Sequence, residues 1–166
     1  MREKITKTDI KKIKEEIDHR RTVVRSQCLE AVKEARAHGD LSENFEYHAA
    51  KRDKNQNESR IRYLENLLRH AVIVSDEAKE GEVGLNTKVT VYIEDDDEEE
   101  TYKLVTSIRG NSVNRMISTE SPLGKALIYH KPGDRVEVFV NEKISYFVTI
   151  RSIERAGDEE DRIRKF

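Results

Sequence analysis

The chain has 166 residues, of which 36 % are hydrophobic and 39 % are charged, with a net charge of −2 and no tryptophan. This composition excludes one large globular core but is enough for a helical hairpin plus a small compact module. The single cysteine excludes a disulfide framework and a cysteine-rich zinc site, and the absence of a long apolar run or a signal-like N-terminus leads us to expect a soluble, cytoplasmic protein without membrane contact.

A long helix is predicted from Lys7 to about Ala37, because this stretch contains no glycine or proline. Its apolar residues follow a seven-residue repeat with two further core positions: Ile10, Ile17, Val24 and Ala31, then Ile13 and Ala35. Gly39 follows the last periodic residue and is expected to end the helix with a positive φ.

A second long helix is predicted from about Tyr47 onward, with seam positions spaced alternately three and four residues apart. These positions are Tyr47, Ala50, Lys54, Asn57, Ile61, Leu64, Leu68 and Ala71. The short connection requires the two helices to lie antiparallel, as a coiled-coil hairpin. Polar seam residues such as Lys54 and Asn57 usually fix the register at some cost in stability.

Beyond the hairpin the periodicity changes from helical to alternating. Residues 75–84 are polar, contain two glycines and are predicted to be a linker. Strands are predicted over residues 88–93, 101–108, 114–118, 135–140 and 144–153. A short helix is predicted after Ser121 and Pro122, which fit the N-cap and first helical positions. The expected fold is α+β, with a coiled-coil hairpin over residues 1–74 and an antiparallel β-sheet domain with one short helix over residues 85–166.

Asp40 and Glu43 lie in the turn between the two predicted helices. One interpretation is structural: a capping box, with Asp40 as N-cap of the second helix and Glu43 at its third residue. The other is that both carboxylates point outward and help to hold a divalent cation. Two carboxylates are too few for a tight Mg²⁺ site, unless a second protein completes it.

Charged segments give weaker indications. Residues 1–74 hold 17 Lys and Arg against 13 Asp and Glu, whereas residues 75–166 hold 14 against 20, so the hairpin is the half able to approach nucleic acid. Arg36, Lys51, Arg52 and Lys54, near the turn, are able to contact phosphates or form a solvated face. The acidic run at residues 94–100 is predicted to be a solvated hairpin loop, since it lacks the spacing of a calcium loop.

Several motifs together resemble the GreA/GreB family of bacterial transcript cleavage factors, and the GreA branch more than the GreB branch. The most specific is ARAHGDLSENFEYHAAK, residues 35–51. The pattern continues in the second helix through residues 60–73, and in the later segments SPLGKAL (121–127) and PGD (132–134). The resemblance covers nearly the whole chain in order.

The resemblance implies an N-terminal coiled coil and a C-terminal domain like the FK506-binding proteins (FKBP-like), acting as a monomer on bacterial RNA polymerase. The C-terminal domain would dock at the rim of the secondary channel, and the coiled coil would enter it. Asp40 and Glu43 would help to hold the second Mg²⁺ of the polymerase active site, where backtracked RNA is hydrolysed near its 3′ end. The chain would then be a cofactor of the polymerase and not an enzyme by itself.

By the same resemblance, Arg36, Tyr47, Lys51 and Arg52 are expected to contact the RNA 3′ end. The sequence Glu120-Ser121-Pro122 is expected to dock on the polymerase rim. The chain departs from the family pattern in three places. Phe45 stands where alanine is typical, Glu120 where aspartate is common, and Asp9 where glycine is usual.

Other functions remain open from the sequence. A family paralogue that enters the channel and inhibits transcription without cleavage usually has altered tip acids, whereas Asp40 and Glu43 are intact here. A prolyl isomerase or chaperone using the C-terminal domain would need an aromatic-lined pocket. A coiled-coil scaffold would need no chemistry at all.

Overall fold

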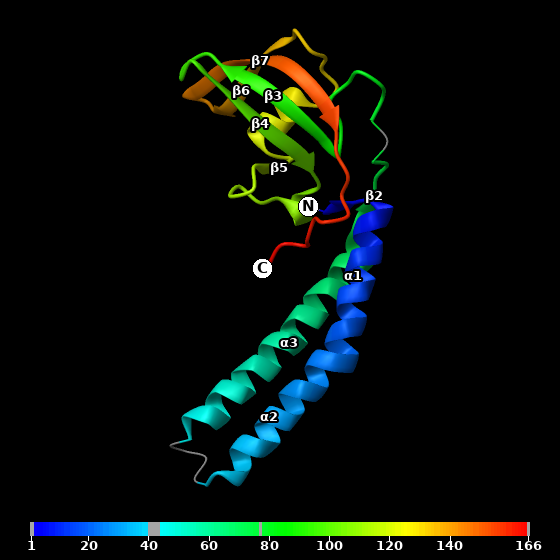
Figure 1. Cartoon of the computed structure of the whole chain (residues 1–166), viewed down its shortest axis with the longest axis vertical. Helices are drawn as coiled ribbons and strands as arrows, with labels where there is room; N and C mark the ends of the chain where they lie inside the picture. The colour runs from blue at the N-terminus through cyan, green and yellow to red at the C-terminus, as the bar shows by residue number, and fades with distance from the viewer. Residues whose placement is uncertain (1, 40–43, 77, 166) are drawn as a thin grey trace. The chain divides into compact units, whose positions relative to one another are not determined.

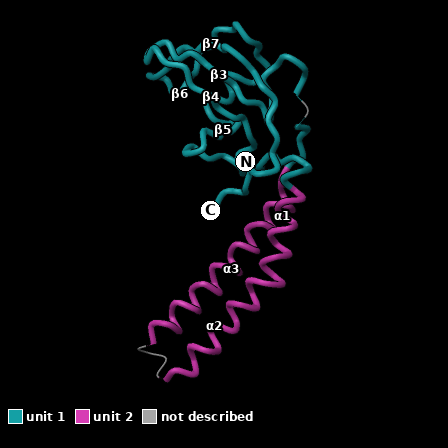
Figure 2. Tube along the Cα trace, viewed as in Figure 1, with its two compact units in different colours: residues 1–9, 72–166 teal, residues 10–71 magenta. Residues whose placement is uncertain are grey.

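The structure is a computed structural model that describes residues 2–39, 44–76 and 78–165 (Figure 1). The described chain divides into two compact units, Ile10–Ala71 and Met1–Asp9 together with Val72–Phe166 (Figure 2). The predicted fold class is confirmed, since a helical hairpin is followed by a sheet with a short helix. The hairpin unit begins later than the expected range of residues 1–74, because the first nine residues group with the sheet.

The hairpin unit has two long arms. The first arm runs through helix α1 (Lys7–His19), a π-helical turn (Arg20–Val24) and helix α2 (Arg25–Ala37). The second arm is helix α3 (Phe45–His70). As predicted, Gly39 follows the end of α2. Its φ is +123°, a backbone conformation that residues with a Cβ rarely adopt.

The π-helical turn changes which residues of the first arm face α3. Ile13, Ile17 and Ala35 are buried as predicted, but Ala31 is exposed and Val32 is buried in its place. A π turn accommodates one residue more than the α-helix around it. If that one residue is discounted, Val32 and Ala35 lie three heptads after Ile10 and Ile13. The prediction of Ala31 was wrong because a seven-residue repeat assumes an uninterrupted α-helix.

The seam of α3 is partly polar, as the sequence predicts. Asn57 is 4 % exposed and pairs with Arg20 on the opposite arm, accepting from Arg20 Nη1 at 3.1 Å and donating from Nδ2 to the Arg20 carbonyl at 3.3 Å. The same carbonyl accepts the backbone N–H of Arg25, the bond that closes the π turn. Leu67 is more buried than the predicted Leu68, and the seam also includes Arg60.

The second unit is built on a mixed sheet. Its strands are β3 (Thr87–Ile93), β4 (Glu98–Val105), β5 (Met116–Ser118), β6 (Arg135–Asn141) and β7 (Ile144–Arg155), in the order β5-β4-β3-β7-β6. All pairings are antiparallel except β4 with β5, so the expectation of a purely antiparallel sheet was wrong at this edge. Two short strands, β1 (Lys4–Ile5) and β2 (Val72–Ile73), form a separate parallel pair.

Alternating strand residues form the core of this unit. Val89, Val91, Val138, Val148 and Ile150 are buried on one face, and they pack with Leu127 of the short helix α4 (Pro122–Leu127). The period of two in the sequence therefore predicts the buried face directly.

The acidic run after β3 is only partly a loop. Residues 94–97 form the turn, but Glu98, Glu99 and Glu100 already belong to β4, with Glu99 opposite Tyr92. The prediction of a solvated loop over the whole run was wrong here, because strand pairing with β3 outweighs the low strand preference of glutamate.

A buried charge cluster explains why the first residues join the second unit. Asp9 and Arg109 form an ion pair of 2.7 Å, and both side chains are fully buried. Asp9 also accepts hydrogen bonds from the Thr6 backbone and the Thr106 hydroxyl, each at 2.9 Å. Arg109 lies in a 3₁₀ turn (Ser107–Arg109) and pairs in addition with Asp161 at 2.8 Å. These interactions hold residues near both termini against the sheet.

Candidate functional site at the hairpin turn

The predicted tip acids, Asp40 and Glu43, lie outside the described residues, but the start of α3 tests the structural interpretation, in which they cap this helix. The helix begins at Phe45, and its N-cap is Asn44, whose Oδ1 accepts the Tyr47 N–H at 3.0 Å. A capping box formed by Asp40 and Glu43 is therefore wrong for this helix. Its cap comes from a residue that sequence reasoning missed, although asparagine is a preferred N-cap.

Asn44 also connects the two arms. Its Nδ2 donates to the carbonyl of Ala35 at 2.7 Å, in the last turn of α2. One amide side chain thus satisfies an orphan N–H of α3 and gives a second hydrogen bond to the Ala35 carbonyl, which also accepts the His38 N–H at 3.2 Å. The ends of α2 and α3 are held at a defined separation by this contact.

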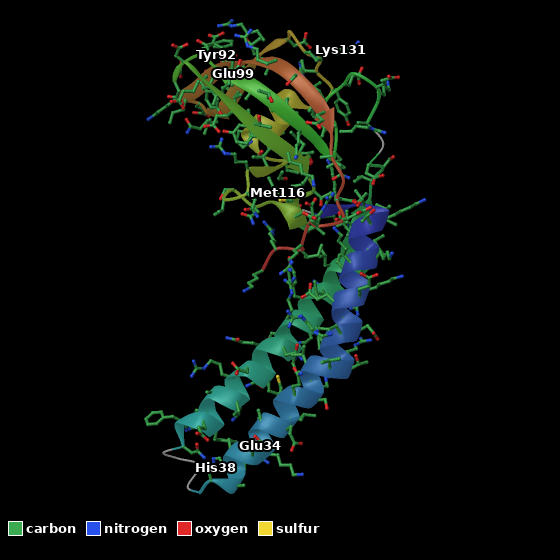
Figure 3. The ribbon with its side chains drawn as sticks, in the orientation of Figure 1. Glu34, His38, Tyr92, Glu99, Met116 and Lys131 are labelled. Atoms are coloured by element: carbon green, nitrogen blue, oxygen red, sulfur yellow. The ribbon has the colours of Figure 1, made fainter. Side chains whose placement is uncertain are left out.

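A second contact between the arms lies nearby. His38 Nδ1 and Glu46 Oε2 are 2.9 Å apart, with both side chains mostly exposed. His38 follows α2 at the end of the hairpin, with Glu34 one turn before it (Figure 3).

Three of the predicted RNA-contacting residues cluster beside the turn. The Tyr47 ring packs on Val32, Ala35 and Ala50, and the Arg36 guanidinium lies 5.6 Å from its centroid. The pKa of Tyr47 is lowered, mainly by the hydrogen bond from Arg36 and further by the charge of Lys51, while partial burial opposes the shift. Tyr47 is thus half-buried in the seam, with its hydroxyl end in a positive environment.

The fourth predicted residue, Arg52, lies on another face of α3. Arg52, Phe45 and His48 are exposed, and their spacing of three and four residues places them on one side of the helix. Phe45 is 87 % exposed, in agreement with its expected position outside the seam. The turn region therefore presents a partly buried tyrosine with two cations on one side and an exposed phenylalanine with one cation on the other.

No group of three or more His, Cys, Asp or Glu side chains that would hold a metal ion occurs among the residues that the structure describes. Over the same described ranges, no helix is both long and apolar enough to cross a membrane.

Cys28 lies on α2, and burial raises the pKa of its thiol, with Asp53 and Glu58 adding to the shift.

The predicted docking residues lie together at the start of α4. Ser121 is the N-cap: its Oγ accepts the Gly124 N–H at 3.1 Å and donates to the Ser118 carbonyl at 2.6 Å. Pro122 occupies the first turn, as predicted. Glu120 pairs with Lys4 at 2.8 Å, and the hydrogen bond from Lys4 lowers the pKa of this carboxyl. All three residues also have structural roles.

The sharp entry into α4 depends on Gly124. A Cβ at this position would lie 2.0 Å from the Ser118 carbonyl oxygen, so a larger residue would displace β5 or α4. The segment from residue 118 to 124 is thus held rigidly by capping and close backbone approach.

The second unit also contains an open cavity of about 490 Å³ beside these residues. It is lined mainly by aliphatic and charged side chains, including Lys4, Glu120 and Lys125, and among the described lining residues Tyr129 supplies the aromatic ring. This lining does not resemble the aromatic pocket that a prolyl isomerase would need.

Comparison with known families gives two matches that together span nearly the whole chain. Residues 3–73 match the family described as "Transcription elongation factor, N-terminal". Residues 78–155 match "Transcription elongation factor, GreA/GreB, C-term". The boundary between the matches falls within residues 74–77, at the start of the predicted linker.

Similar individual proteins include two transcription elongation factors named GreA. The one from Chloroherpeton thalassium is 44 % identical over 141 residues, covering 84 % of this chain and 89 % of the relative. The one from Macrococcus caseolyticus is 42 % identical over 134 residues, covering 81 % and 85 %. Among solved structures, the GreA factor homolog 1 (Gfh1) of Thermus thermophilus is 27 % identical, with a TM-score of 0.41 and coverage of 93 % and 99 %.

Proposed function

Since the chain belongs to the GreA/GreB family of transcription elongation factors, we propose that it enters the secondary channel of bacterial RNA polymerase and stimulates cleavage of backtracked RNA. The observation that carries this proposal is the start of α3. Because Asn44 caps that helix, the capping box does not account for Asp40 and Glu43, two acids at the end of a long hairpin. A function of these two acids in the active site of another molecule would account for their position.

The two acids have the right chemistry for Mg²⁺, which prefers carboxylate oxygens and usually keeps waters or phosphates as further ligands. Asp40 and Glu43 would hold the ion jointly with acidic residues of the polymerase. When bound, Mg²⁺ supplies charge stabilisation to the phosphodiester that is cleaved. The free protein is not expected to bind the ion tightly, because two carboxylates are too few.

The other residues beside the turn would bind and orient the RNA. Arg36 and Lys51 carry positive charge next to the Tyr47 hydroxyl, and this hydroxyl is able to donate a hydrogen bond to the RNA. Arg52, on a separate exposed face, would contact a phosphate. These residues act on substrate position, whereas the two acids act at the reacting phosphodiester.

A stalled, backtracked polymerase complex with labelled RNA tests the proposal. We expect the protein with Mg²⁺ to shorten the RNA, and Asp40→Asn or Glu43→Gln to slow cleavage by about 100-fold, the usual loss when one electrostatic contact to a transition state is removed. Glu34→Gln is the matched control, because it removes one negative charge from the neighbouring turn of α2. Unchanged cleavage in both acid variants would overturn the assigned chemistry, and inhibition without cleavage would favour a channel-blocking paralogue.

Docking is tested separately from cleavage. Glu120→Gln should raise the protein concentration needed for half-maximal cleavage while leaving the rate at saturation unchanged. Lys4→Met breaks the same ion pair from the other side and is the matched control. Equal weakening by both variants would show that the ion pair matters for structure alone and would contradict a direct role of the Glu120 carboxylate in docking.

A further inference from the structure

Phe45 is the first residue of α3 and is 87 % exposed. Single exposed apolar residues are common on protein surfaces, so exposure alone carries no argument. The position of Phe45 differs from those of Val23 and Leu29, the other large hydrophobic residues that are exposed in the described part of the hairpin, because Phe45 directly follows the turn that carries the tip acids. A large ring at this point is presented to whatever the turn approaches.

The neighbours of Phe45 on the same face identify the kind of ligand. His48, Ala49 and Arg52 follow at three, four and seven residues, which places them along one side of α3, and all are exposed. The opposite side holds Tyr47 and Ala50, which pack with α2. Phe45 is therefore not turned toward the seam. Its face combines an aromatic ring, a small residue, an imidazole and a guanidinium.

This combination fits a single-stranded nucleic acid better than an apolar protein surface. A base stacks on an aromatic ring, and a guanidinium pairs with a phosphate of the same strand. Phe45 and Arg52 are separated by about 10 Å along the helix axis, or roughly three stacked nucleotides at 3.4 Å each. An apolar protein partner would require further apolar side chains beside the ring, and among the described residues of α3 this face offers Ala49 alone.

We propose that Phe45 stacks on an unpaired base of the backtracked RNA strand, while Arg52 contacts a phosphate of that strand. The inference rests on the proposed function for the identity of the strand. It adds a binding residue that acts on base position and leaves the cleavage chemistry to Asp40 and Glu43. Bases with larger stacking surfaces, the purines, should be bound more tightly.

The test uses a backtracked polymerase complex whose extruded RNA carries 2-aminopurine, a base whose fluorescence is quenched by stacking. The full-length protein carries Glu43→Gln, so that the RNA stays intact during the measurement. We expect quenching with Phe45 and with Phe45→Trp, and its loss with Phe45→Leu, which keeps apolar bulk but has no aromatic face. Leu29→Ala, an exposed apolar position elsewhere on the hairpin, is the matched control and should not change the signal.

A second measurement uses the protein with both tip acids intact. Phe45→Leu should raise the concentration for half-maximal RNA cleavage about tenfold, within the range that one stacked base contributes. On RNA with an abasic nucleotide at the stacked position, Phe45→Leu should have no further effect. An equal loss on normal and abasic RNA, or full quenching by the leucine variant, would overturn the proposal and indicate contact with the polymerase protein.

The two proposals fail separately. If quenching depends on Phe45 but the protein with both tip acids does not shorten the RNA, the stacking proposal is supported and the cleavage function is rejected. RNA shortening that is indifferent to Phe45→Leu would retain the function and reject the stacking. Absence of both signals would reject both.

Discussion

Arg60 on the second arm of the hairpin holds the carboxylate of Glu16 on the first through two hydrogen bonds, Nε to Oε1 at 2.9 Å and Nη2 to Oε2 at 3.1 Å. The Arg60 side chain is 7 % exposed and that of Glu16 is 24 % exposed. Glu16 also accepts from Arg20 Nε at 2.8 Å. The Arg60–Glu16 ion pair therefore lies in the seam, which continues with aliphatic residues such as Ile13 and Leu64. It joins the two arms of the hairpin.

Arg60→Met should destabilise the hairpin by about 2 kcal/mol, because it leaves the Glu16 carboxylate half-buried with one cation fewer; the loss is below that of a fully buried pair since Glu16 retains some solvent. Chemical denaturation followed by helical circular dichroism measures the change. Arg25→Met, which breaks the more exposed pair with Glu58, is the control and should cost less than about 1 kcal/mol. Equal losses in the two variants would contradict the importance of burial.

Glu16 should also make hairpin stability depend on pH. Burial acts to raise its pKa, but the hydrogen bonds from Arg60 and Arg20 outweigh burial, so the net pKa lies below the ordinary 4.5. A carboxyl with a lowered pKa in the folded state contributes stability above pH 4.5, and this contribution is lost as the pH falls through the folded-state value. The difference in melting temperature between the wild type and Glu16→Gln should be largest near pH 7 and shrink below pH 4.5. A constant difference from pH 7 to pH 3 would be the contrary result.

The π-helical turn predicts an unusual tolerance to deletion. Removing Thr22, an exposed residue of that turn, should convert it into a regular α-helical turn and leave Val32 and Ala35 in the seam. Stability should change by less than about 1 kcal/mol. Removing the exposed Glu30 from α2 instead turns the following residues by about 100° and takes Val32 out of the seam. The Glu30 deletion variant should therefore melt at a clearly lower temperature than the Thr22 deletion variant. Similar melting temperatures would contradict the interpretation of the π turn as a one-residue insertion.

Asn44 should stabilise the end of the hairpin through both of its contacts. Asn44→Ala removes the cap of α3 and the bond to the Ala35 carbonyl, and should cost about 1 kcal/mol or more. Asn44→Asp keeps the capping oxygen but lacks the N–H₂ donor to Ala35, so an intermediate loss is expected. Hydrogen exchange of the Tyr47 amide checks the cap directly. Its protection should fall in the alanine variant and persist in the aspartate variant.

Much of the fold follows from the sequence because it depends on local periodicity. The absence of glycine and proline predicts the first long helix, and Gly39 predicts where it ends. The alternating spacing of three and four residues predicts the second helix. The alternation of Val89 and Val91, or of Val148 and Ile150, predicts which face of each strand is buried. The cap at Ser121 is equally local, because it requires only a side-chain oxygen within three residues of Gly124.

The sequence was also sufficient to recognise the family, through motifs at the hairpin turn and around Ser121, and the family matches cover those same segments. Asp40 and Glu43 remain a prediction from that resemblance, since they lie outside the described residues. The roles of Arg36, Tyr47, Lys51 and Arg52 at RNA also remain predictions. The structure adds that Arg36 and Tyr47 are in contact, whereas Arg52 lies about two turns after Phe45 on the same side of α3.

The features that only the tertiary structure decided are those that join residues far apart in the chain. The ion pair of Asp9 with Arg109 places the first residues with the sheet, and its partners are 100 positions apart. The choice of Val32 over Ala31 depends on a π turn whose carbonyl at Arg20 is bound by Asn57 from the opposite arm. Local periodicity holds no information on such partners, because the free energy of burying a charge or inserting a residue is set by the groups that meet it in space.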